Sequence, residues 1–232
     1  RHRFPTLLER YGDNLAIGPS PELESESGFF ADIGLKCSAD LVENIEVELG
    51  VTGFGSLPDN LIVFMQNSQK NVKAMNVAKS EVVGIESSLS IAHLWAQAQL
   101  HYSFIQARDT GDVLGMQGNT PPGIPAHQLD VLVTTGPSWL QLGWELNFKS
   151  ERYLDQANLR PIPSTAVQAI SVQVVVETLN MSLKARLDNL TNLRKDSVVL
   201  PGRDSMAMVK ASDMIGYPLP GRTFFIGASW EL

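Results

Sequence analysis

The sequence has few of the residues that disulfide-bonded, metal-binding or catalytic proteins need. Cys37 is its one cysteine, so no disulfide can form within the chain. The four histidines show no metal-ligand spacing, and we expect no metal site and no cofactor. No nucleophile-elbow, zinc-protease, Walker or dinucleotide-binding motif occurs, so we do not expect an enzyme. The histidines are His2, His93, His101 and His127.

Basic residues and long apolar runs are also scarce. The chain has 18 Lys and Arg against 25 Asp and Glu, and the resulting net charge of -7 argues against a nucleic-acid partner. No run approaches the roughly 18 apolar residues of a membrane-spanning helix. Aromatic residues make up only 7% of the chain, which is low for a membrane barrel with aromatic girdles. With 44% hydrophobic residues, the chain is compatible with one large β domain or two small domains.

Apolar and polar residues alternate with a period of two in nine segments, which predicts nine β-strands. The segment 139–151 is the most regular, and 222–232 has the length of about 9–11 residues that a tilted strand needs to cross a bilayer. The nine segments are 26–38, 44–55, 77–91, 94–107, 126–136, 139–151, 165–177, the stretch around 183–187, and 222–232.

Each of these strands would have an apolar face and a polar face. In a membrane barrel the apolar face contacts lipid and the polar face lines the lumen, whereas in a soluble sandwich the polar face contacts solvent. The strand pattern alone fits both. In the barrel, the residues expected to face the lumen, and so a plug or ligand, are Glu46, Glu48, Gln97, Gln99, His101, Gln141, Glu145, Lys184 and Arg186. Those expected to face lipid are Leu140, Leu142, Trp144, Leu146, Phe148, Phe224, Ile226 and Trp230.

The lengths of the connections favour the barrel. Short junctions near 39–43, 92–93, 137–138 and 178–180 alternate with long ones near 56–76, 108–125, 152–164 and 191–221. In an antiparallel meander this alternation places every short turn at one end and every long loop at the other. Outer-membrane barrels have this asymmetry, with short periplasmic turns and long extracellular loops. Four loops longer than about 12 residues are uncommon in compact soluble domains.

Several motifs resemble those of TonB-dependent outer-membrane receptors, and they occur in that family's order. Arg3-Phe-Pro-Thr-Leu-Leu-Glu-Arg-Tyr-Gly12 and Gly18-Pro-Ser-Pro-Glu-Leu-Glu-Ser-Glu-Ser27 are similar to two consecutive segments that precede a strand. Asn60-Leu-Ile-Val-Phe-Met-Gln-Asn67 and Leu187-Asp-Asn-Leu-Thr-Asn192 resemble later elements. Tyr217-Pro-Leu-Pro-Gly-Arg-Thr-Phe-Phe-Ile-Gly227 looks like the beginning of the family's terminal strand.

The resemblance implies a particular fold and a set of partners. The fold class is all-β, an antiparallel up-and-down meander of about nine strands that forms the C-terminal portion of a 22-stranded transmembrane barrel. Residues 1–232 would form this portion, and the plug domain and the early strands would lie upstream. The implied partners are outer-membrane lipid, the plug and the remaining strands, the TonB complex through the missing N-terminal part, and the barrel-assembly machinery. The assembly machinery would read Gly227, Trp230 and Leu232, although family members usually end in an aromatic residue.

The function implied by the resemblance is active uptake across the outer membrane of a Gram-negative bacterium. The ligand would be scarce and bulky, typically a ferric siderophore, less often cobalamin, haem or a saccharide. Two alternatives remain open at this point: a passive porin, which needs neither a plug nor energy, and a soluble β protein used for binding or structure. Nine antiparallel strands do not close as a bacterial barrel. We therefore expect an open, curved sheet with exposed edges at 26–38 and 222–232.

Overall fold

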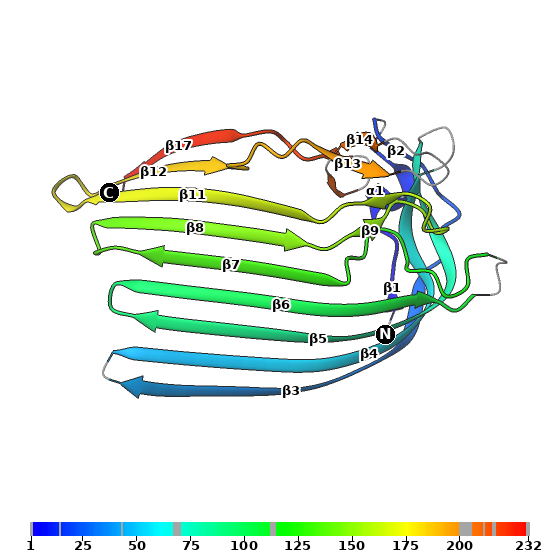
Figure 1. Cartoon of the computed structure of the whole chain (residues 1–232), viewed down its shortest axis with the longest axis horizontal. Coiled ribbons are helices and arrows are strands. Elements are labelled where there is room, and N and C mark those ends of the chain that lie inside the picture. Colours follow the sequence, from blue (N-terminus) through cyan, green and yellow to red (C-terminus); the bar gives the residue numbers. More distant parts are fainter. Residues whose placement is uncertain are drawn as a thin grey trace.

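The structure, a computed structural model, describes residues 2–230 except 14, 43, 67–70, 112–114, 200–205, 211 and 215–216. Nine long strands form one antiparallel meander in which sequence neighbours are also sheet neighbours (Figure 1). The predicted all-β meander of nine strands is confirmed. The sheet is not closed, because β3 (Glu26–Val42) and β17 (Thr223–Trp230) lie near its opposite edges. The remaining long strands are β4 (Ile45–Gln66), β5 (Val72–His93), β6 (Ala96–Asp109), β7 (His127–Thr135), β8 (Leu140–Lys149), β11 (Thr165–Val176) and β12 (Met181–Asp188).

Short elements accompany this sheet. Two of them join it at its margins: β1 (His2–Arg3) pairs with β3, and β2 (Ile17–Gly18) pairs in parallel with β5. Among the described residues the one α-helix is α1 (Leu7–Tyr11), and a 3-10 helix, η1, covers Glu177–Leu179. Three separate hairpins are described: β9 (Arg152–Tyr153) with β10 (Pro161–Ile162), β13 (Lys195–Val199) with β14 (Met206–Lys210), and β15 (Ser212–Met214) with β16 (Tyr217–Pro218).

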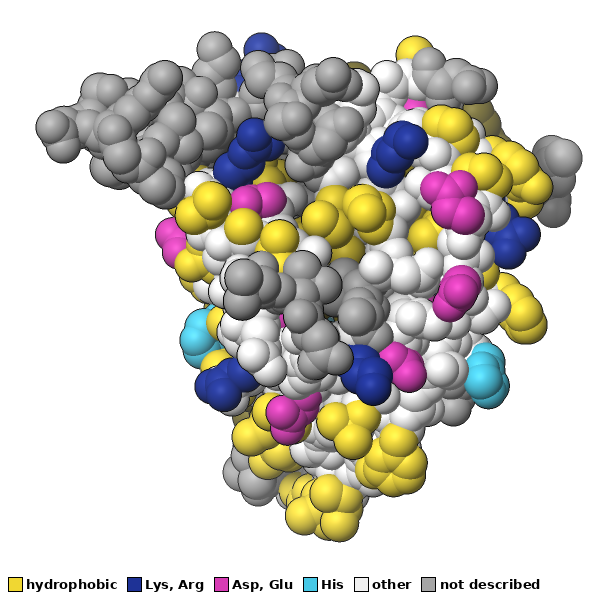
Figure 2. All heavy atoms as spheres, turned by 90° about the vertical axis from the view of Figure 1, so that its right-hand side faces the viewer, with side chains coloured by type: hydrophobic (Ala, Val, Ile, Leu, Met, Phe, Trp, Pro, Cys, Tyr) yellow, Lys and Arg dark blue, Asp and Glu magenta, His cyan; other side chains and the backbone are white. Residues whose placement is uncertain are grey.

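The four predicted short connections lie at one end of the sheet, and three of the four predicted long loops lie at the other. The four short connections, which follow β3, β5, β7 and β11, lie at the left end in Figure 1. Positive φ angles at Asn44, Gly136 and Asn180 allow the chain to reverse there, since Asn and Gly tolerate this region best. The loops that follow β6, β8 and β12 lie at the right end, which we call the long-loop end. Figure 2 views the molecule from this end, where hydrophobic and charged side chains are interspersed on the surface.

The predicted long loop at 56–76 is wrong over most of its length. β4 continues to Gln66 and β5 begins at Val72, so this stretch extends the hairpin. The loop was predicted because the alternation is regular only up to about residue 55 and resumes near residue 77, and Pro58 and Asn60 between them are typical turn residues. The register is nevertheless the same on both sides of them, with Ser56 opposite Val82 and Leu61 opposite Val77. Pairing along the adjoining apolar segments therefore overrides the local preference for a turn, as tertiary context often does.

The two clusters of buried apolar residues in the described part of the chain lie at the long-loop end of the sheet. Ile17 packs with Val72, and Leu23 packs with Ile62 and Ala74. Both clusters are on the extended hairpin of β4 and β5. Along the rest of the sheet, many large apolar side chains remain exposed. A single two-sided layer of this kind differs from a soluble sandwich, in which a second sheet would cover the apolar face.

Candidate functional site: the two faces of the sheet

The strand register sorts the side chains of the main sheet into two faces. Directly opposed residues of an antiparallel pair point to the same side, and the side alternates along each strand. One row across the sheet contains Lys36, Gly50, Ser88, His101, Asp130 and Asn147. The row next to it contains Cys37, Leu49, Leu89, Leu100, Val131 and Leu146. We call the first side the polar face and the second the apolar face.

All nine residues predicted for the lumen lie on the polar face. Glu46 is in one row with Gln97, and Glu48 is in one row with Gln99 and Glu145. The remaining members are joined by the same register: His101 with Asp130, Gln141 through Gln173 with Lys184, and Arg186 through Ser171 with Gly143. The period-2 pattern therefore placed these side chains on a common surface. Which ligand or plug residue contacts them stays a prediction.

All eight residues predicted to face lipid lie on the apolar face. Leu140 to Phe148 alternate along β8, and Phe224, Ile226 and Trp230 oppose Leu187, Ala185 and Met181. Many side chains on this face are open; Ile170 is 45% exposed and Ile226 is 75% exposed. In contact with water, such a surface would be costly, because burying apolar area contributes about 25 cal/mol per Å². We therefore expect a hydrophobic medium to cover it.

The apolar face contains Gln168, whose amide is not left without a partner. The indole Nε1–H of Trp144 donates a hydrogen bond of 3.2 Å to Gln168 Oε1. The two residues lie on adjacent strands, and Gln168 is opposite Leu146. This bond satisfies the amide oxygen of Gln168, which would be costly to leave unpaired on an apolar surface removed from water. Trp144 thus has a second role beyond supplying apolar area.

Carboxylates dominate the polar face from β3 to β7, whereas β8 to β12 carry both signs of charge. Between strands, Lys36 Nζ lies 2.9 Å from Glu48 Oε2. Arg186 donates to both carboxylate oxygens of Glu145 and, over 2.8 Å, to Asp188. The acidic residues from β3 to β7 are Asp32, Asp40, Glu46, Glu48, Glu86 and Asp130. Charged groups in the middle of strands are thus paired across the sheet or face an open interior.

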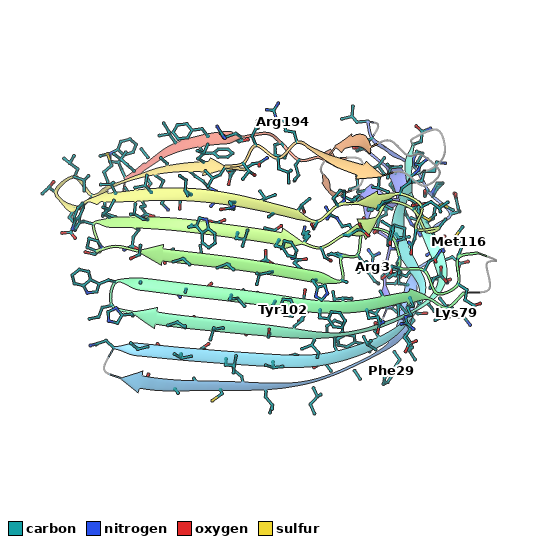
Figure 3. The ribbon with its side chains drawn as sticks, viewed as in Figure 1. Arg3, Phe29, Lys79, Tyr102, Met116 and Arg194 are labelled. Atoms are coloured by element: carbon teal, nitrogen blue, oxygen red, sulfur yellow. The ribbon has the colours of Figure 1, made fainter. Side chains whose placement is uncertain are left out.

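Two open hollows occupy the middle of the polar face and share His101 and Asp130. One, of about 380 Å³, is bordered by Thr52, Glu86 and Ser103. The other, of about 440 Å³, is bordered by Glu145, Asn147 and Arg186. The Asp130 carboxylate accepts hydrogen bonds from the amides of Asn147 and Gln128. Figure 3 labels Tyr102, the neighbour of His101, midway along β6.

Four polar residues of these hollows are not among the nine predicted for the lumen: Glu86, Asp130, Asn147 and Asp188. The signal was present, since each occupies the polar position of an alternating segment. Which of these polar residues lie together in one hollow depends on register, which only the paired sheet reveals. Among the described residues, no three His, Cys, Asp or Glu side chains are placed to hold a metal ion.

Comparison with known proteins identifies the family. Residues 2–193 match the family model described as "TonB dependent receptor-like, beta-barrel". The chain belongs to this TonB-dependent receptor family. The resemblance found from the short motifs is therefore confirmed. No curated protein sequence matches the chain. No helix among the described residues has the length and hydropathy to cross a membrane.

Solved structures of similar fold are consistent with this family. The copper transporter OprC aligns with a TM-score of 0.64 and 17% identity, over 100% of this chain and 36% of its own length. The siderophore receptor PiuA from Acinetobacter baumannii aligns with a TM-score of 0.58 and 20% identity, over 88% of this chain and 28% of its own. A mutant of the ferric enterobactin receptor PfeA from Pseudomonas aeruginosa aligns with a TM-score of 0.60 and 18% identity, over 91% of this chain and 32% of its own. The chain thus spans about a third of the length of these proteins.

Residues of the motif at 187–192 form hydrogen bonds that connect neighbouring segments at the long-loop end. The buried Asn189 donates from its amide to the carbonyl oxygens of Leu193 and Pro220, and so joins the loop after β12 to the residues before β17. Asn192 accepts from the Arg222 N–H over 2.9 Å. The proposed assembly signal is described only in part: Gly227 and Trp230 lie in β17, and Leu232 lies outside the described residues.

Proposed function

We propose that this chain is the C-terminal wall of a TonB-dependent outer-membrane receptor that takes up a scarce ligand such as a ferric siderophore. The observation that carries the proposal is a one-layer meander whose register separates an open apolar face from a charged polar face. In this role the apolar face contacts outer-membrane lipid, and the polar face lines the lumen around a plug domain. The plug, the earlier strands and the contact with the TonB complex belong to the rest of the receptor.

The comparisons support this role over a passive porin. Two of the three similar structures described above are named as receptors, for a siderophore and for ferric enterobactin, and the third as a copper transporter. A two-sided sheet alone would fit a porin equally well. The family match favours the receptor, because residues 2–193 match a barrel model of TonB-dependent receptors. We propose no enzymatic activity, and we leave the chemical identity of the ligand to experiment.

Uptake by cells that express the full-length receptor tests the proposal. Cells lacking their own receptors are given radiolabelled iron bound to a panel of siderophores, with and without a protonophore. We expect uptake of at least one complex, and we expect the protonophore to abolish it, since the driving energy comes from the inner membrane. Uptake that is insensitive to the protonophore and depends only on solute size would instead indicate a porin.

A further inference from the structure

The N-terminal segment wraps around the extended hairpin of β4 and β5. β1 pairs with the β3 edge, where Arg3 lies opposite Glu26, and β2 pairs with the far edge of β5, where Ile17 lies opposite Val72. Between them, α1 connects one edge to the other. We call the described residues of 2–26 the clasp, and residues 57–66 with 72–79 the hairpin tip. Figure 1 shows the hairpin tip and α1 together at the long-loop end.

Arg3 is the central residue of the clasp. Its guanidinium donates to both oxygens of Glu26, with distances of 2.7 and 2.5 Å, and to Glu9 at 3.0 Å. The same Glu26 carboxylate accepts the backbone N–H of Ile62, 2.8 Å away in the hairpin tip. Bidentate guanidinium–carboxylate pairs are the stronger class of hydrogen-bonded ion pair. One side chain thus joins β1, α1, β3 and, through Glu26, the hairpin tip. Figure 3 labels Arg3 at this end of the sheet.

A second set of contacts joins the end of the clasp to the hairpin tip. The backbone N–H of Glu24 donates to Asn76 Oδ1, and the Asn76 amide donates back to the Glu24 carbonyl. The Asn60 amide donates to the Glu24 carboxylate over 2.8 Å. Apolar contacts accompany these bonds: Ile17 of the clasp packs on Val72 of the tip, and Leu23 packs on Ile62 and Ala74. The clasp therefore supplies part of the small core that holds the tip in place.

The docked position of α1 also has two costs. Leu7 and Tyr11 lie on one face of the helix and are 77% and 60% exposed, while Glu9 on the other face is 6% exposed. Phe4, which precedes the helix, is also 77% exposed. The helix is therefore turned opposite to its amphipathic pattern, in which the apolar stripe should face the protein. In addition, Arg10 Nε is buried without a hydrogen-bond partner. A buried donor without a partner is destabilising.

The clasp is therefore held by a few strong hydrogen bonds, around Arg3 and Glu24, while the exposed apolar face of α1 and the unpaired Arg10 Nε destabilise its docked position. This combination is what we expect of an element that is stable in more than one position. The pairing of β1 and of β2 involves two residues each, so little backbone pairing is lost on release. We propose that the clasp is a two-position conformational device. Docked, it holds the hairpin tip; undocked as a unit around Arg3, it releases the tip. This inference does not depend on which ligand the receptor takes up.

Hydrogen exchange of the full-length receptor in detergent micelles, followed by mass spectrometry, tests the proposal. In the unaltered protein, peptides of the clasp and the hairpin tip should exchange at one common rate, as a cooperative unit does. Arg3→Gln should raise the exchange of both together by about tenfold, which is the effect of losing a charge-assisted hydrogen bond. Peptides from β7 and β8 should not change.

The matched control is Lys36→Gln, which removes an exposed ion pair from the same strand that carries Glu26. It should leave the exchange of clasp and tip unchanged. A disulfide between His2→Cys and Ser27→Cys, opposed residues of β1 and β3, should restore protection to Arg3→Gln. Cys37→Ser in the background prevents mispairing, since Cys37 is exposed.

Three results would overturn the proposal. The first is faster exchange in residues 2–11 of Arg3→Gln while the hairpin tip stays protected. The second is no change in either segment, and the third is a tip that remains unprotected after the disulfide forms. If Arg3→Gln does not assemble, Glu9→Gln keeps the bidentate pair with Glu26 and is interpreted in the same way, with a smaller joint rise expected.

Discussion

Exchanging one aliphatic residue for lysine on each face of the sheet would show which face contacts lipid. Ile170 lies near the middle of β11, opposite Trp144, and Leu132 lies in β7, opposite Gln99 and Glu145. Both are aliphatic residues in the interior of a strand. Hydropathy alone therefore predicts the same outcome for Ile170→Lys and Leu132→Lys. The register predicts different outcomes, because Ile170 is on the apolar face and Leu132 is on the polar face.

The size of the expected difference follows from the surroundings of the two side chains. Ile170 is 45% exposed, so in water its replacement would alter stability by no more than about 0.5 kcal/mol. In lipid, a lysine near the bilayer midplane costs about 2–4 kcal/mol. At Leu132 the new ammonium group would face Glu145, and we expect a change below about 1 kcal/mol.

The assay is the free energy of unfolding of the full-length receptor in lipid vesicles, from denaturant titration. Ile170→Lys should lower the midpoint clearly, whereas Leu132→Lys should stay close to the unaltered protein. Equal losses in the two variants would refute the division into a lipid face and a lumen face. A larger loss for Leu132→Lys would reverse the assignment of the faces.

Three further predictions concern single contacts. Trp144→Phe should destabilise the receptor in lipid by about 1–2 kcal/mol, because the Gln168 carbonyl loses its donor, and adding Gln168→Leu should recover most of that loss in the same titration. Burial raises the pKa of Glu9, but hydrogen bonds from Thr6 and Arg3 outweigh it and leave the pKa below its usual value. Ionised Glu9 therefore stabilises the clasp at neutral pH, and this contribution should disappear as the pH falls below about 4. The loss should appear as faster cleavage of residues 2–26 by an acid-tolerant protease. Glu9→Gln should lack this pH dependence. Ile17 is 2% exposed, so Ile17→Ala leaves a cavity and should lower the local free energy of unfolding of the hairpin tip by about 2–4 kcal/mol. Hydrogen exchange should become faster in the hairpin tip and stay unchanged in β7 and β8.

The strands with a regular alternation were predictable because the polarity of each residue indicates the face of the sheet to which its side chain points. β8 was expected at 139–151 and is found at Leu140–Lys149, and the last strand was expected at 222–232 and is found at Thr223–Trp230. Antiparallel neighbours joined by short turns then share one register, so the predicted lumen and lipid sets fell on separate faces. Local pattern and tertiary pairing agree in these strands.

The hairpin of β4 and β5 was not predictable in the same way. Pro58 and Asn60 are typical turn residues, and Asn60 has a positive φ of 58°. The strand continues past them because Ile62 and Ala74 gain a core with Leu23, more than thirty residues away in sequence. The clasp was also missed, since a carboxylate such as Glu9 gives no sign in the sequence that it will be buried beside Arg3.

The sequence by itself determined the class of fold, the number of long strands, the two faces and the separation of short turns from long loops. These properties follow from the period of two along each strand and from loop length, both of which are local. Tertiary structure alone decided which polar groups form ion pairs, such as Arg186 with Glu145 across β11, and how the N-terminal segment packs around the hairpin of β4 and β5. Such contacts depend on register between distant segments, and their free energy arises only once the strands are paired.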